Sequence, residues 1–377
     1  MSSHLPDTGS LSARITRARE AAAAAGVGAL FVAPGSDLRY LLGVAGGSFE
    51  RLTCLVLPAA DLAVEPTLVV PALERPGYDH VPTDELGVGV ATWVDGDDPF
   101  RLAFHALGRR PGRVAVTDMM PALHVLGLRR EAPDAEQSLA GPVLRELRMR
   151  KDDVEVAALR RAGEAIDRVH ASMGEWLRAG RTEAEVAADI AAAIVAEGHE
   201  LAGFVIVGSG PNGASPHHDV SDRVIERGDV VVVDIGGPVA EGYNSDSTRT
   251  YVLGEPRDAD VAATYTVLQR AQQAAVDVVR PGVTAATVDA TARRIIEDAG
   301  FGERFIHRTG HGIGLDVHEE PYIIAGNELP LEPGMAFSVE PGIYLPGRWG
   351  ARIEDIVVVT DHGVASLNNR PHELVAL

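Results

Sequence analysis

The chain has 377 residues, of which 46% are hydrophobic and 23% are charged, and its formal net charge is -20. This length and composition are typical of a globular protein with two domains or one large domain, and they exclude a disordered or fibrous chain. A surface this acidic repels phosphate backbones and anionic lipid headgroups. We therefore expect neither nucleic acid nor membrane surfaces as partners.

Cysteine content and the N-terminal sequence bear on the cellular compartment. Cys54 is the only cysteine, so no intrachain disulfide can form, and we expect a buried, inert thiol in a reducing compartment. The first residues lack the pattern of a signal peptide, and no apolar stretch approaches the ~18 to 20 residues that span a bilayer. The sequence therefore predicts a cytoplasmic protein.

The N-terminal part of the chain alternates helix-like and strand-like patterns. The pattern over residues 14–25 predicts a helix, and short apolar runs predict strands over residues 29–33, 52–57, 67–70 and 113–117. A strand followed by a turn is an adequate interpretation of residues 36–41. We therefore predict an α/β domain over residues 1–144, which ends just after Gly141 and Pro142 interrupt the chain.

Two helices are predicted early in the second domain, which we expect over residues 145–377. In the second of these helices Thr182 and Glu185 form a capping-box pair, and Gly198 ends the helix. In the first helix, apolar side chains recur at intervals of three and four residues, which predicts one buried face: Leu159, Ala162, Ile166, Val169, Met173 and Leu177.

The second domain contains an internal repeat of a helix, a strand and two acids. Four helix positions recur 102 residues later, namely Gly180 as Gly282, Thr182 as Thr284, Val186 as Val288 and Gly198 as Gly300. An apolar strand with an acid follows each helix, at Asp234 and at Glu340, and a second acid comes after each strand, at Asp246 and at Glu354. Two halves related by a pseudo-two-fold axis would bring the four acids together.

Each acid has an ordinary structural explanation when it is considered alone. Asp234 and Glu340 precede glycines and could be turn residues, Asp246 could pair with Arg249, and Glu354 could join a solvated ion-pair network. Together, however, four converging carboxylates cannot all stay ionised without cations. Oxygen-rich sites suit divalent ions such as Mn²⁺, and one imidazole would also admit Co²⁺, Fe²⁺ or Zn²⁺.

Histidines are concentrated around these acids. His311 lies in a glycine-rich segment, residues 307–314, whose backbone can approach closely and direct an imidazole inward. His307 and His318 fall within the same 12 positions, and His217 and His218 lie on a loop before the first acid-bearing strand. We therefore expect an imidazole in the metal site, and His311 can supply it.

Such a cluster predicts metal-assisted hydrolysis. A pair of close metal ions can ionise a bound water near neutral pH and polarise a scissile carbonyl, while nearby histidines bind substrate or move protons. The spacing of the ligands alone does not distinguish a peptide from a phosphate ester or from another amide.

Nearly the whole chain resembles the pita-bread metallopeptidases, in particular the Xaa-Pro aminopeptidases and the Xaa-Pro dipeptidases (prolidases). Five segments carry the resemblance: residues 210–217, 234–250, 310–321, 340–344 and 352–355. The resemblance implies an N-terminal creatinase-like α/β domain followed by a C-terminal pita-bread domain with an internal pseudo-two-fold repeat, in the α/β (α+β) class.

The resemblance also implies a set of five metal ligands. Asp234 would chelate one metal ion, and His311 with Glu340 would bind the other. Asp246 and Glu354 would bridge both ions, and a hydroxide between the ions would be the nucleophile.

Further roles follow from the same resemblance. Glu340 would act as the proton acceptor, and His217 and His318 would hold the substrate or the tetrahedral intermediate. His307 would shape the substrate pocket, and Arg352 would orient the ligand carboxylates. Pro216-His217 favours His217 over its neighbour His218 in this role.

One spacing departs from the family. Eleven residues separate Asp234 from Asp246, where the family usually has ten, and the usual spacing would fall on Ser245. A hydroxyl cannot replace a bridging carboxylate, so we predict that Asp246 is the ligand and that a one-residue hairpin extension or a bulge absorbs the difference.

The activity expected from the resemblance is hydrolysis of the bond before proline in short proline-containing peptides, by an aminopeptidase or a dipeptidase. The expected cofactors are two divalent ions, foremost Mn²⁺, and the expected assembly is a homodimer. Two alternatives stay open. One is a related pita-bread hydrolase acting on another amide or small metabolite, such as a creatinase-like enzyme, and the other is a noncatalytic peptide-binding module.

Overall fold

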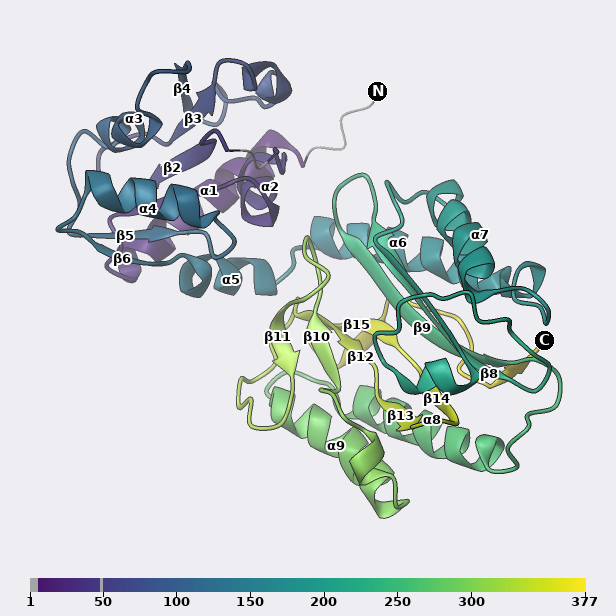
Figure 1. Cartoon of the computed structure of the whole chain (residues 1–377). Coiled ribbons are helices and arrows are strands. Elements are labelled where there is room, and N and C mark those ends of the chain that lie inside the picture. Colours follow the sequence, from purple (N-terminus) through teal and green to yellow (C-terminus); the bar gives the residue numbers. More distant parts are fainter. Residues whose placement is uncertain (1–5, 48–49) are drawn as a thin grey trace. The chain divides into compact units, whose positions relative to one another are not determined.

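The computed structural model describes residues 6–47 and 50–377. The chain divides into two compact units, Met1–Arg148 and Met149–Leu377 (Figure 1). The division falls at the end of helix α5 (Gly141–Met149), whereas the predicted break near residue 144 lies inside this helix. Gly141 and Pro142 begin α5 rather than interrupting the chain, because proline is tolerated in the first turn of a helix.

The first unit is built around a single six-stranded sheet with the order β4-β3-β2-β1-β5-β6. β2 runs antiparallel to both of its neighbours, whereas the β3–β4, β1–β5 and β5–β6 pairs are parallel. The strands are β1 (Ala29–Val32), β2 (Cys54–Pro58), β3 (Thr67–Pro71), β4 (Gly89–Trp93), β5 (Arg113–Val116) and β6 (Glu136–Leu139). The helices are α1 (Thr8–Ala24), α2 (Ser36–Leu42), α3 (Pro99–Ala106), α4 (Ala122–Glu131) and α5.

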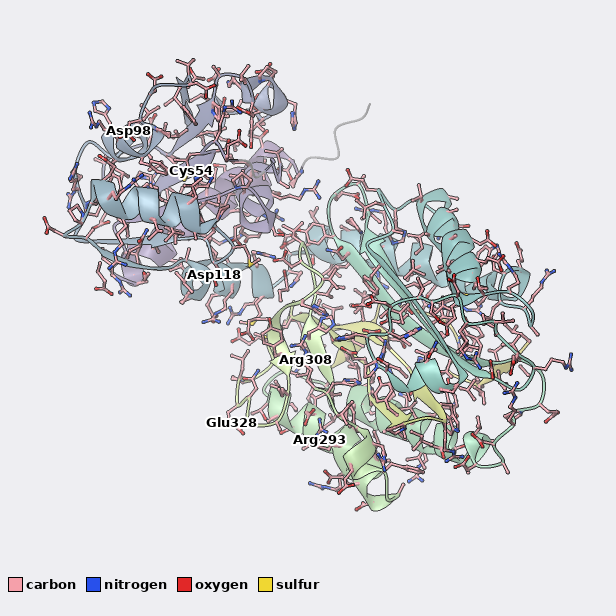
Figure 2. The ribbon with its side chains drawn as sticks, in the orientation of Figure 1. Cys54, Asp98, Asp118, Arg293, Arg308 and Glu328 are labelled. Atoms are coloured by element: carbon pink, nitrogen blue, oxygen red, sulfur yellow. The ribbon has the colours of Figure 1, made fainter. Side chains whose placement is uncertain are left out.

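The helix predicted over residues 14–25 and the four predicted strands are present in this unit, with ends shifted by a few residues. The expectation of a strand and turn over residues 36–41 is wrong, because this segment forms α2. Leu38, Leu41 and Leu42 are fully buried at helical spacing, which drives the helical conformation. Cys54 is buried in β2 (Figure 2), and burial raises the pKa of its thiol.

The second unit contains a four-stranded sheet (β17-β9-β8-β7), a five-stranded sheet (β11-β10-β12-β15-β16) and the hairpin β13-β14. Its helices are α6 (Asp153–Ala171), α7 (Glu183–Ala196), α8 (Val261–Val278) and α9 (Ala285–Asp298). The first strands are β7 (Phe204–Ser209), β8 (Val230–Pro238), β9 (Asn244–Val252), β10 (Gly310–Gly312), β11 (Glu319–Ile323) and β12 (Ala336–Val339). The others are β13 (Gly342–Leu345), β14 (Trp349–Arg352), β15 (Asp355–Val359), β16 (Val364–Ser366) and β17 (Val375–Ala376).

The helices of this unit cover its strands in two groups. α6 and α7 pack against β7, β8 and β9, whereas α8 and α9 pack against β11, β12 and β14 (Figure 1). Each group has its own apolar core, the first centred on Ile166, Ile190 and Val233, the second on Leu268 and Phe337. The strands that carry the candidate site residues therefore lie between the helix pair α6–α7 and the helix pair α8–α9.

The helices α7 and α9 reproduce the predicted repeat. Both have 14 residues, and each begins at a threonine N-cap, Thr182 or Thr284, whose side chain accepts a hydrogen bond from the third backbone N–H of the helix. The predicted capping box between Thr182 and Glu185 is present.

The first predicted helix of the second domain ends earlier than expected. α6 stops at Ala171, and Met173 lies in a separate 3₁₀ turn, Met173–Glu175. Met173 and Leu177 are nevertheless buried in the same core as Ile166. Their apolar spacing therefore reports burial rather than a continuous helix. No helix among residues 6–47 and 50–377 is long and apolar enough to cross a membrane.

Candidate metal centre and active site

Asp234 and Asp246 lie on one face of the β8–β9 hairpin. The antiparallel ladder places Asp234 opposite Thr248 and Asp246 opposite Gly236, with no shift of register. Because opposite residues share a face and side chains alternate along each strand, both carboxylates point to the same side of the hairpin. The position of Asp234 in the middle of β8 also contradicts the interpretation of this residue as part of a turn.

The continuous ladder locates the extra residue between the two aspartates. β8 and β9 stay in register up to the Pro238–Asn244 pair, so the additional residue lies in the turn over residues 239–243 and not in a bulge. Ser245 points to the opposite face, where its hydroxyl lies 2.7 Å from His199 Nε2. Asp234 and Asp246 are 12 positions apart. In this register an even spacing puts both side chains on the same face of the hairpin.

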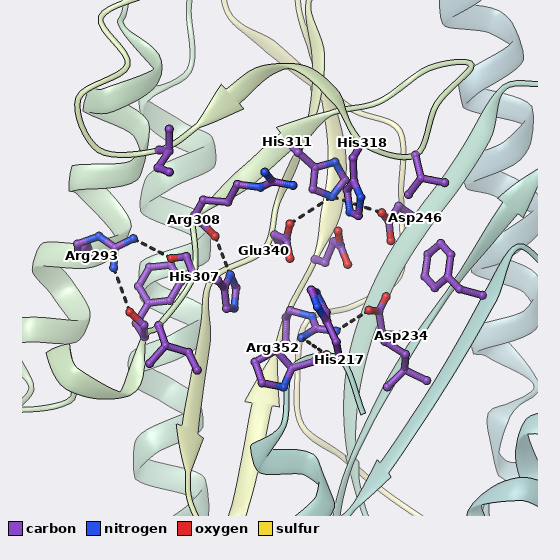
Figure 3. A pocket seen from close by; sticks show the side chains of 18 residues that line it. His217, Asp234, Asp246, Arg293, His307, Arg308, His311, His318, Glu340 and Arg352 are labelled. Carbon is purple, nitrogen blue, oxygen red and sulfur yellow. Dashed lines mark hydrogen bonds and ion pairs between the residues drawn. The ribbon is translucent and has the colours of Figure 1, made fainter. Parts of the chain in front are cut away.

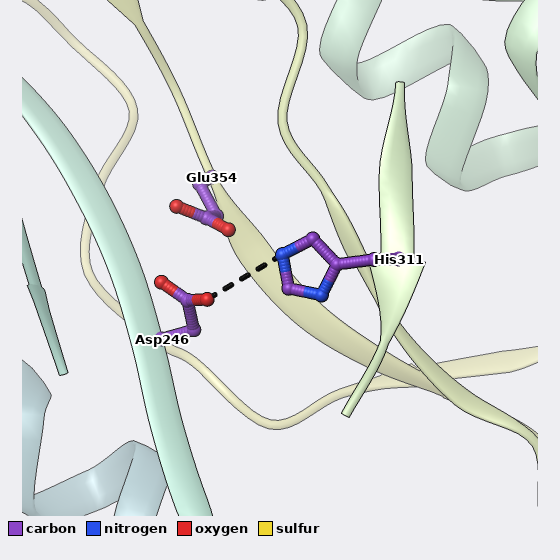
Figure 4. A group of neighbouring side chains, drawn as sticks. All are labelled: Asp246, His311 and Glu354. Atoms are coloured by element: carbon purple, nitrogen blue, oxygen red, sulfur yellow. Dashed lines mark ion pairs between the residues drawn. The ribbon is translucent and has the colours of Figure 1, made fainter. Parts of the chain in front are cut away.

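The acids of the second half approach this face from other strands. Glu340 directly follows β12, and Glu354 lies between β14 and β15, where its backbone N–H donates to the Thr248 carbonyl at 3.1 Å. Figure 4 shows Asp246, Glu354 and His311 converging, and their ligand atoms all lie within 4.8 Å of one another. His311 Nε2 is 3.6 Å from Asp246 Oδ2 and 3.3 Å from Glu340 Oε1.

The local contacts of His311 prepare one ring nitrogen as a ligand. Nδ1 lies 3.1 Å from the Gly312 carbonyl oxygen, which can only accept a hydrogen bond, so Nδ1 carries the hydrogen and Nε2 keeps its lone pair. Burial and the neighbouring His318 lower the pKa of His311 to about 3. The imidazole is therefore neutral at physiological pH, as a metal ligand must be.

A cavity of about 860 Å³ brings together all nine residues that the sequence singled out. Figure 3 shows the cavity from close by. The nine are Asp234, Asp246, His311, Glu340, Glu354, His217, His307, His318 and Arg352.

The electrostatics of the cavity are those of acids crowded together out of water. Burial, reinforced by the charges of neighbouring acids, raises the pKa of Asp246 and of Glu354 well above the ordinary carboxyl range. Burial, with a further contribution from the Asp234 charge, raises the pKa of Glu340 to about 7. Ionised carboxylates at these positions therefore require a source of positive charge.

The residues present fit divalent cations. Four carboxylates and the guanidinium groups of Arg308 and Arg352 leave a formal charge of -2 when all are ionised, so the acids outnumber the cations that the protein supplies. Arg352 Nη2 bonds Asp234 Oδ2, whereas Asp234 Oδ1 is buried without a hydrogen-bond partner among the described residues. An orphaned carboxylate oxygen and the free lone pair of His311 Nε2 are suitable donors for a cation.

The ordinary explanations for Asp246 and Glu354 do not describe their surroundings. Arg249 forms its ion pair with Asp355, at 2.7 Å, and not with Asp246. Glu354 is only 2% exposed, so it does not belong to a solvated ion-pair network, and its Oε2 accepts a hydrogen bond from Thr248 at 2.7 Å.

The two adjacent histidines of the loop before β8 have different surroundings. His217 lines the cavity, whereas His218 Nε2 lies 2.8 Å from Glu183, a buried carboxylate in the first turn of α7. Glu183 also accepts hydrogen bonds from the backbone N–H and hydroxyl of Ser209 and from the hydroxyl of Ser221. One buried carboxylate thus fixes both ends of the loop that carries His217.

A hydrogen-bonded chain connects the metal-site acids to His307. Arg352 Nη1 donates to the Tyr344 hydroxyl at 2.8 Å, and this hydroxyl lies 2.9 Å from His307 Nε2. His307 Nδ1 donates to the Arg308 carbonyl at 2.7 Å. Burial and the Arg352 charge lower the pKa of His307 to about 3, so it is a neutral wall of the cavity.

Several residues that line the cavity or contact its lining were not singled out in the sequence. Tyr344 lies in the same segment as Glu340, but its contact with His307 joins residues 37 positions apart, which no local pattern reveals. Phe204 and Ile206 line the apolar part of the cavity, and their alternation along β7 is the one local signal that could have indicated a shared face. Phe305, Val317 and Ile324 complete this apolar lining.

Comparisons with known proteins agree with this geometry. Residues 157–361 match the model of "Metallopeptidase family M24", and residues 14–150 match that of the "Creatinase/Prolidase N-terminal domain". The chain is 60% identical to the "Probable dipeptidase PepE" of Mycobacterium tuberculosis, over 97% of this chain and 96% of that one. It is 36% identical to an "Xaa-Pro dipeptidase" of Lactobacillus delbrueckii subsp. lactis, over 93% and 95% of the two chains.

A solved structure gives the same result for the fold. The crystal structure of dipeptidase PepE from Mycobacterium ulcerans superposes with a TM-score of 0.94 and 60% identity, covering 99% of each chain. The first unit therefore has the creatinase-like fold and the second has the pita-bread fold expected from the sequence. The chain belongs to metallopeptidase family M24, among the relatives of the Xaa-Pro dipeptidases.

Proposed function

We propose that this protein hydrolyses the Xaa-Pro bond of short peptides, with a preference for dipeptides, at a centre of two divalent metal ions. The observation that carries the proposal is the convergence of Asp234, Asp246, His311, Glu340 and Glu354 in one cavity whose acids outnumber its unpaired cations. The dipeptidase names of the relatives favour a dipeptidase over an aminopeptidase.

The five ligands divide between the two ions as the resemblance implies. Asp234 would hold one ion through its orphaned Oδ1, and His311 with Glu340 would hold the other, with Asp246 and Glu354 between them. When bound, such ions supply an ionised water as the nucleophile and polarise the scissile carbonyl. Mn²⁺ suits a set of four carboxylates and one imidazole.

Glu340 is the proposed proton carrier. Its Oε1 lies 3.3 Å from His311 Nε2, so this carboxylate would stand beside the attacking water, where it can accept a proton and return it. The proton would pass to the proline nitrogen as the carbon–nitrogen bond breaks, so that the products are a free amino acid and proline.

His217 and His318 are the proposed substrate ligands. Each lines the cavity, and neither ring has a hydrogen-bond partner among the described residues, so their nitrogens can donate to the substrate carbonyl and to the oxyanion that develops from it. His318 packs edge-on against His311, with ring centroids 4.2 Å apart, which fixes its orientation. Arg352 would hold Asp234 in place, since Nη2 bonds its Oδ2.

An apolar wall explains why a proline ring would fit. Phe204, Ile206 and Phe305 line one side of the cavity. The ring of a substrate proline carries no N–H group in an Xaa-Pro bond, so its contact with this apolar wall leaves no hydrogen-bond donor without a partner. His307 closes this region through its ring contact with Phe305, at 5.2 Å between centroids.

The test is a cleavage profile with defined metals. Metal-depleted protein and protein reloaded with Mn²⁺ are incubated with Ala-Pro, Ala-Pro-Gly and, as a control for proline, Ala-Ala. We expect cleavage of Ala-Pro that depends on Mn²⁺, with weaker cleavage of the other two. Absence of metal-dependent cleavage of both proline peptides would contradict the proposal.

The two alternative functions predict different results in the same samples. A creatinase-like enzyme needs no metal, so full activity on a non-peptide amide after metal depletion would favour it. A noncatalytic module would bind Ala-Pro without turnover, and the complete ligand set disfavours it, because such modules are expected to have lost their ligands. The homodimer and the cytoplasmic location stay predictions.

A further inference from the structure

The ring of His318 lies in the cavity without a hydrogen bond to any described residue. Its recorded contact is the edge-on packing against His311, with ring centroids 4.2 Å apart (Figure 3). One ring contact cannot by itself fix the direction of an imidazole, since it lacks the directionality of a hydrogen bond. The place of His318 therefore depends on the backbone of the loop that carries it, residues 313–318, between β10 and β11.

The beginning of this loop is held by the first residue of β9. The Gly314 carbonyl accepts hydrogen bonds from the backbone N–H and from Nδ2 of Asn244, at 2.9 and 3.0 Å. Nδ2 also donates to the Leu315 carbonyl at 3.2 Å. Asn244 is buried and lies two residues before Asp246, so the beginning of the loop is fixed relative to a proposed metal ligand.

A buried ion pair holds the other end of the loop. Lys151 Nζ lies 2.5 Å from Oε1 of Glu319, the residue after His318, and the two side chains are only 1% and 11% exposed. Lysine is rarely buried this completely, and a buried ammonium is stable only beside an anion. The pair is shielded from water, so it holds Glu319 more firmly than an exposed pair could.

Lys151 is itself tied to the strands of the candidate site. Its backbone N–H donates at 2.9 Å to the carbonyl of Gly334, two residues before β12, the strand that Glu340 follows. The ion pair also lies against Gly314, where a Cβ atom would be 2.7 Å from Glu319 Oε1 and 3.1 Å from Lys151 Cε. The lack of a side chain at residue 314 therefore lets the pair pack on the loop.

The anchoring of Glu319 sets the direction of His318. Glu319 begins β11, and side chains of adjacent residues in extended chain point to opposite sides. His318 lines the cavity, whereas neither Lys151 nor Glu319 does. The carboxylate is thus held outside the cavity while the imidazole is directed into it. A misplacement of such a group by ~1 Å can lower the rate about 100-fold.

We propose that the buried Lys151–Glu319 ion pair positions His318 toward the oxyanion that develops from the substrate carbonyl. The proposal rests on the proposed peptidase function, in which His318 is a substrate ligand. Lys151 acts through Glu319 and is a positioning residue rather than a catalytic one. Loss of the pair should therefore leave the metal centre intact and weaken the stabilisation of the transition state.

The experiment removes the pair without leaving a buried charge. Lys151→Met alone would leave the Glu319 carboxylate buried without its cation and can prevent folding, whereas Lys151→Met/Glu319→Met replaces both charges by apolar side chains, which proteins often tolerate. For this double variant we expect unchanged bound Mn²⁺ and a kcat/KM for Ala-Pro lowered by roughly 10- to 100-fold, mainly through kcat. Lys151→Arg keeps the charge and should retain most of the activity.

Two further proteins show whether the loss acts through His318. In a His318→Asn background, removal of the pair should lower kcat/KM by less than about 2-fold, since the group that the pair positions is already absent. The matched control is Arg161→Gln. Arg161, on α6, pairs with Glu241 in the β8–β9 turn at 2.6 Å, but its side chain is 52% exposed, so this variant should keep the wild-type kcat/KM.

A second measurement does not need turnover. In protein loaded with diamagnetic Zn²⁺, the NMR signals of the His318 ring, assigned with His318→Asn, report its packing against the ring of His311. We expect these signals to shift in Lys151→Met/Glu319→Met and to stay unchanged in Arg161→Gln.

Two results would overturn the positioning role while the peptidase function stands. One is a set of unshifted His318 signals in Lys151→Met/Glu319→Met. The other is an equal loss of kcat/KM when the pair is removed from wild type and from His318→Asn. If wild type cleaves no proline peptide, the peptidase function and the role of His318 toward the oxyanion are both wrong, even where the NMR signals shift.

Discussion

Arg352 donates to Asp234 Oδ2 at 2.5 Å, while Asp234 Oδ1, the other oxygen of the same carboxylate, is buried without a hydrogen-bond partner among the described residues. One half of the carboxylate is thus satisfied by the protein, and the other half is left for a ligand. Such a division would let a buried acid be held rigidly and still coordinate a cation.

The buried Asp234–Arg352 pair gives the first prediction. Arg352→Gln removes the cation that is hydrogen-bonded to Asp234, and we expect it to destabilise metal-depleted protein by about 3 to 5 kcal/mol, the cost of breaking a buried pair. Adding Mn²⁺ should recover much of this loss, because the ions supply the missing positive charge. Urea unfolding with and without Mn²⁺ measures both values.

The control for this prediction is Arg348→Gln. Arg348 also pairs with an aspartate, Asp260 at 2.8 Å, but its side chain is 44% exposed. Exposed pairs contribute at most about 1 kcal/mol, so this variant should unfold nearly as wild type does. Equal losses in the two variants would show that the Asp234–Arg352 pair does not behave as a buried one.

The second prediction concerns neighbours on opposite faces of β9. Asp246→Asn removes a proposed bridging charge, so we expect loss of bound metal and a fall in kcat of more than about 100-fold, since even residues that only support a ligand cost 10- to 100-fold. Ser245→Ala alters the other face, where the hydroxyl contacts His199, and should keep both metal and activity. Metal analysis together with Ala-Pro turnover distinguishes the variants, and a fully active Asp246→Asn would remove Asp246 from the ligand set.

These residues also show how far the sequence alone could lead. The repeat indicated that the four acids would converge, whereas the register that puts Asp234 and Asp246 on one face of the β8–β9 hairpin comes from the structure. Residues 36–41 were misjudged because a seven-residue helix is too short to display its period clearly. The contact between Tyr344 and His307 could not be predicted, because it joins residues 37 positions apart on separate segments.

The third prediction concerns the loop that carries His217. Burial acts to raise the pKa of Glu183, but hydrogen bonds from Ser209 and Ser221 outweigh it, so the net shift is downward and the ionised form is the one that holds the loop. Glu183→Gln should therefore lower kcat/KM for Ala-Pro by roughly 10-fold without loss of metal, the effect of misplacing a residue that orients the site.

Two further variants isolate this effect. Glu185→Gln changes an exposed acid of the same helix turn and should retain full activity, because a glutamine can still complete the capping box. In a His217→Asn background, Glu183→Gln should cause little additional loss, since the residue that it positions has already been removed. Additive losses in the double variant would mean that Glu183 acts independently of His217.

The last prediction is a dependence of stability on pH that the metal should abolish. The pKa of Glu340 is raised to about 7 from its usual value of 4.5, so between these values the folded chain binds a proton that the unfolded chain has lost. In chelator-treated protein this carboxyl therefore contributes a loss of stability as pH rises from about 4.5 to about 7. Glu340→Gln removes the contribution, so the variant should exceed wild type by up to about 3 kcal/mol above pH ~7.5 and match it near pH ~4.

Saturating Mn²⁺ should make wild type more stable than Glu340→Gln. Ions that bind only the folded state stabilise wild type by mass action, and the variant lacks one ligand. The exposed Glu328 provides the control, since Glu328→Gln should follow wild type at every pH. The stability of all three proteins is measured by their urea unfolding midpoints across this pH range, in chelator and in Mn²⁺. A Glu340→Gln protein that is no more stable than wild type at pH 8 in chelator would show that burial does not penalise this charge, and the acids of the cavity would then need no cation to stay ionised.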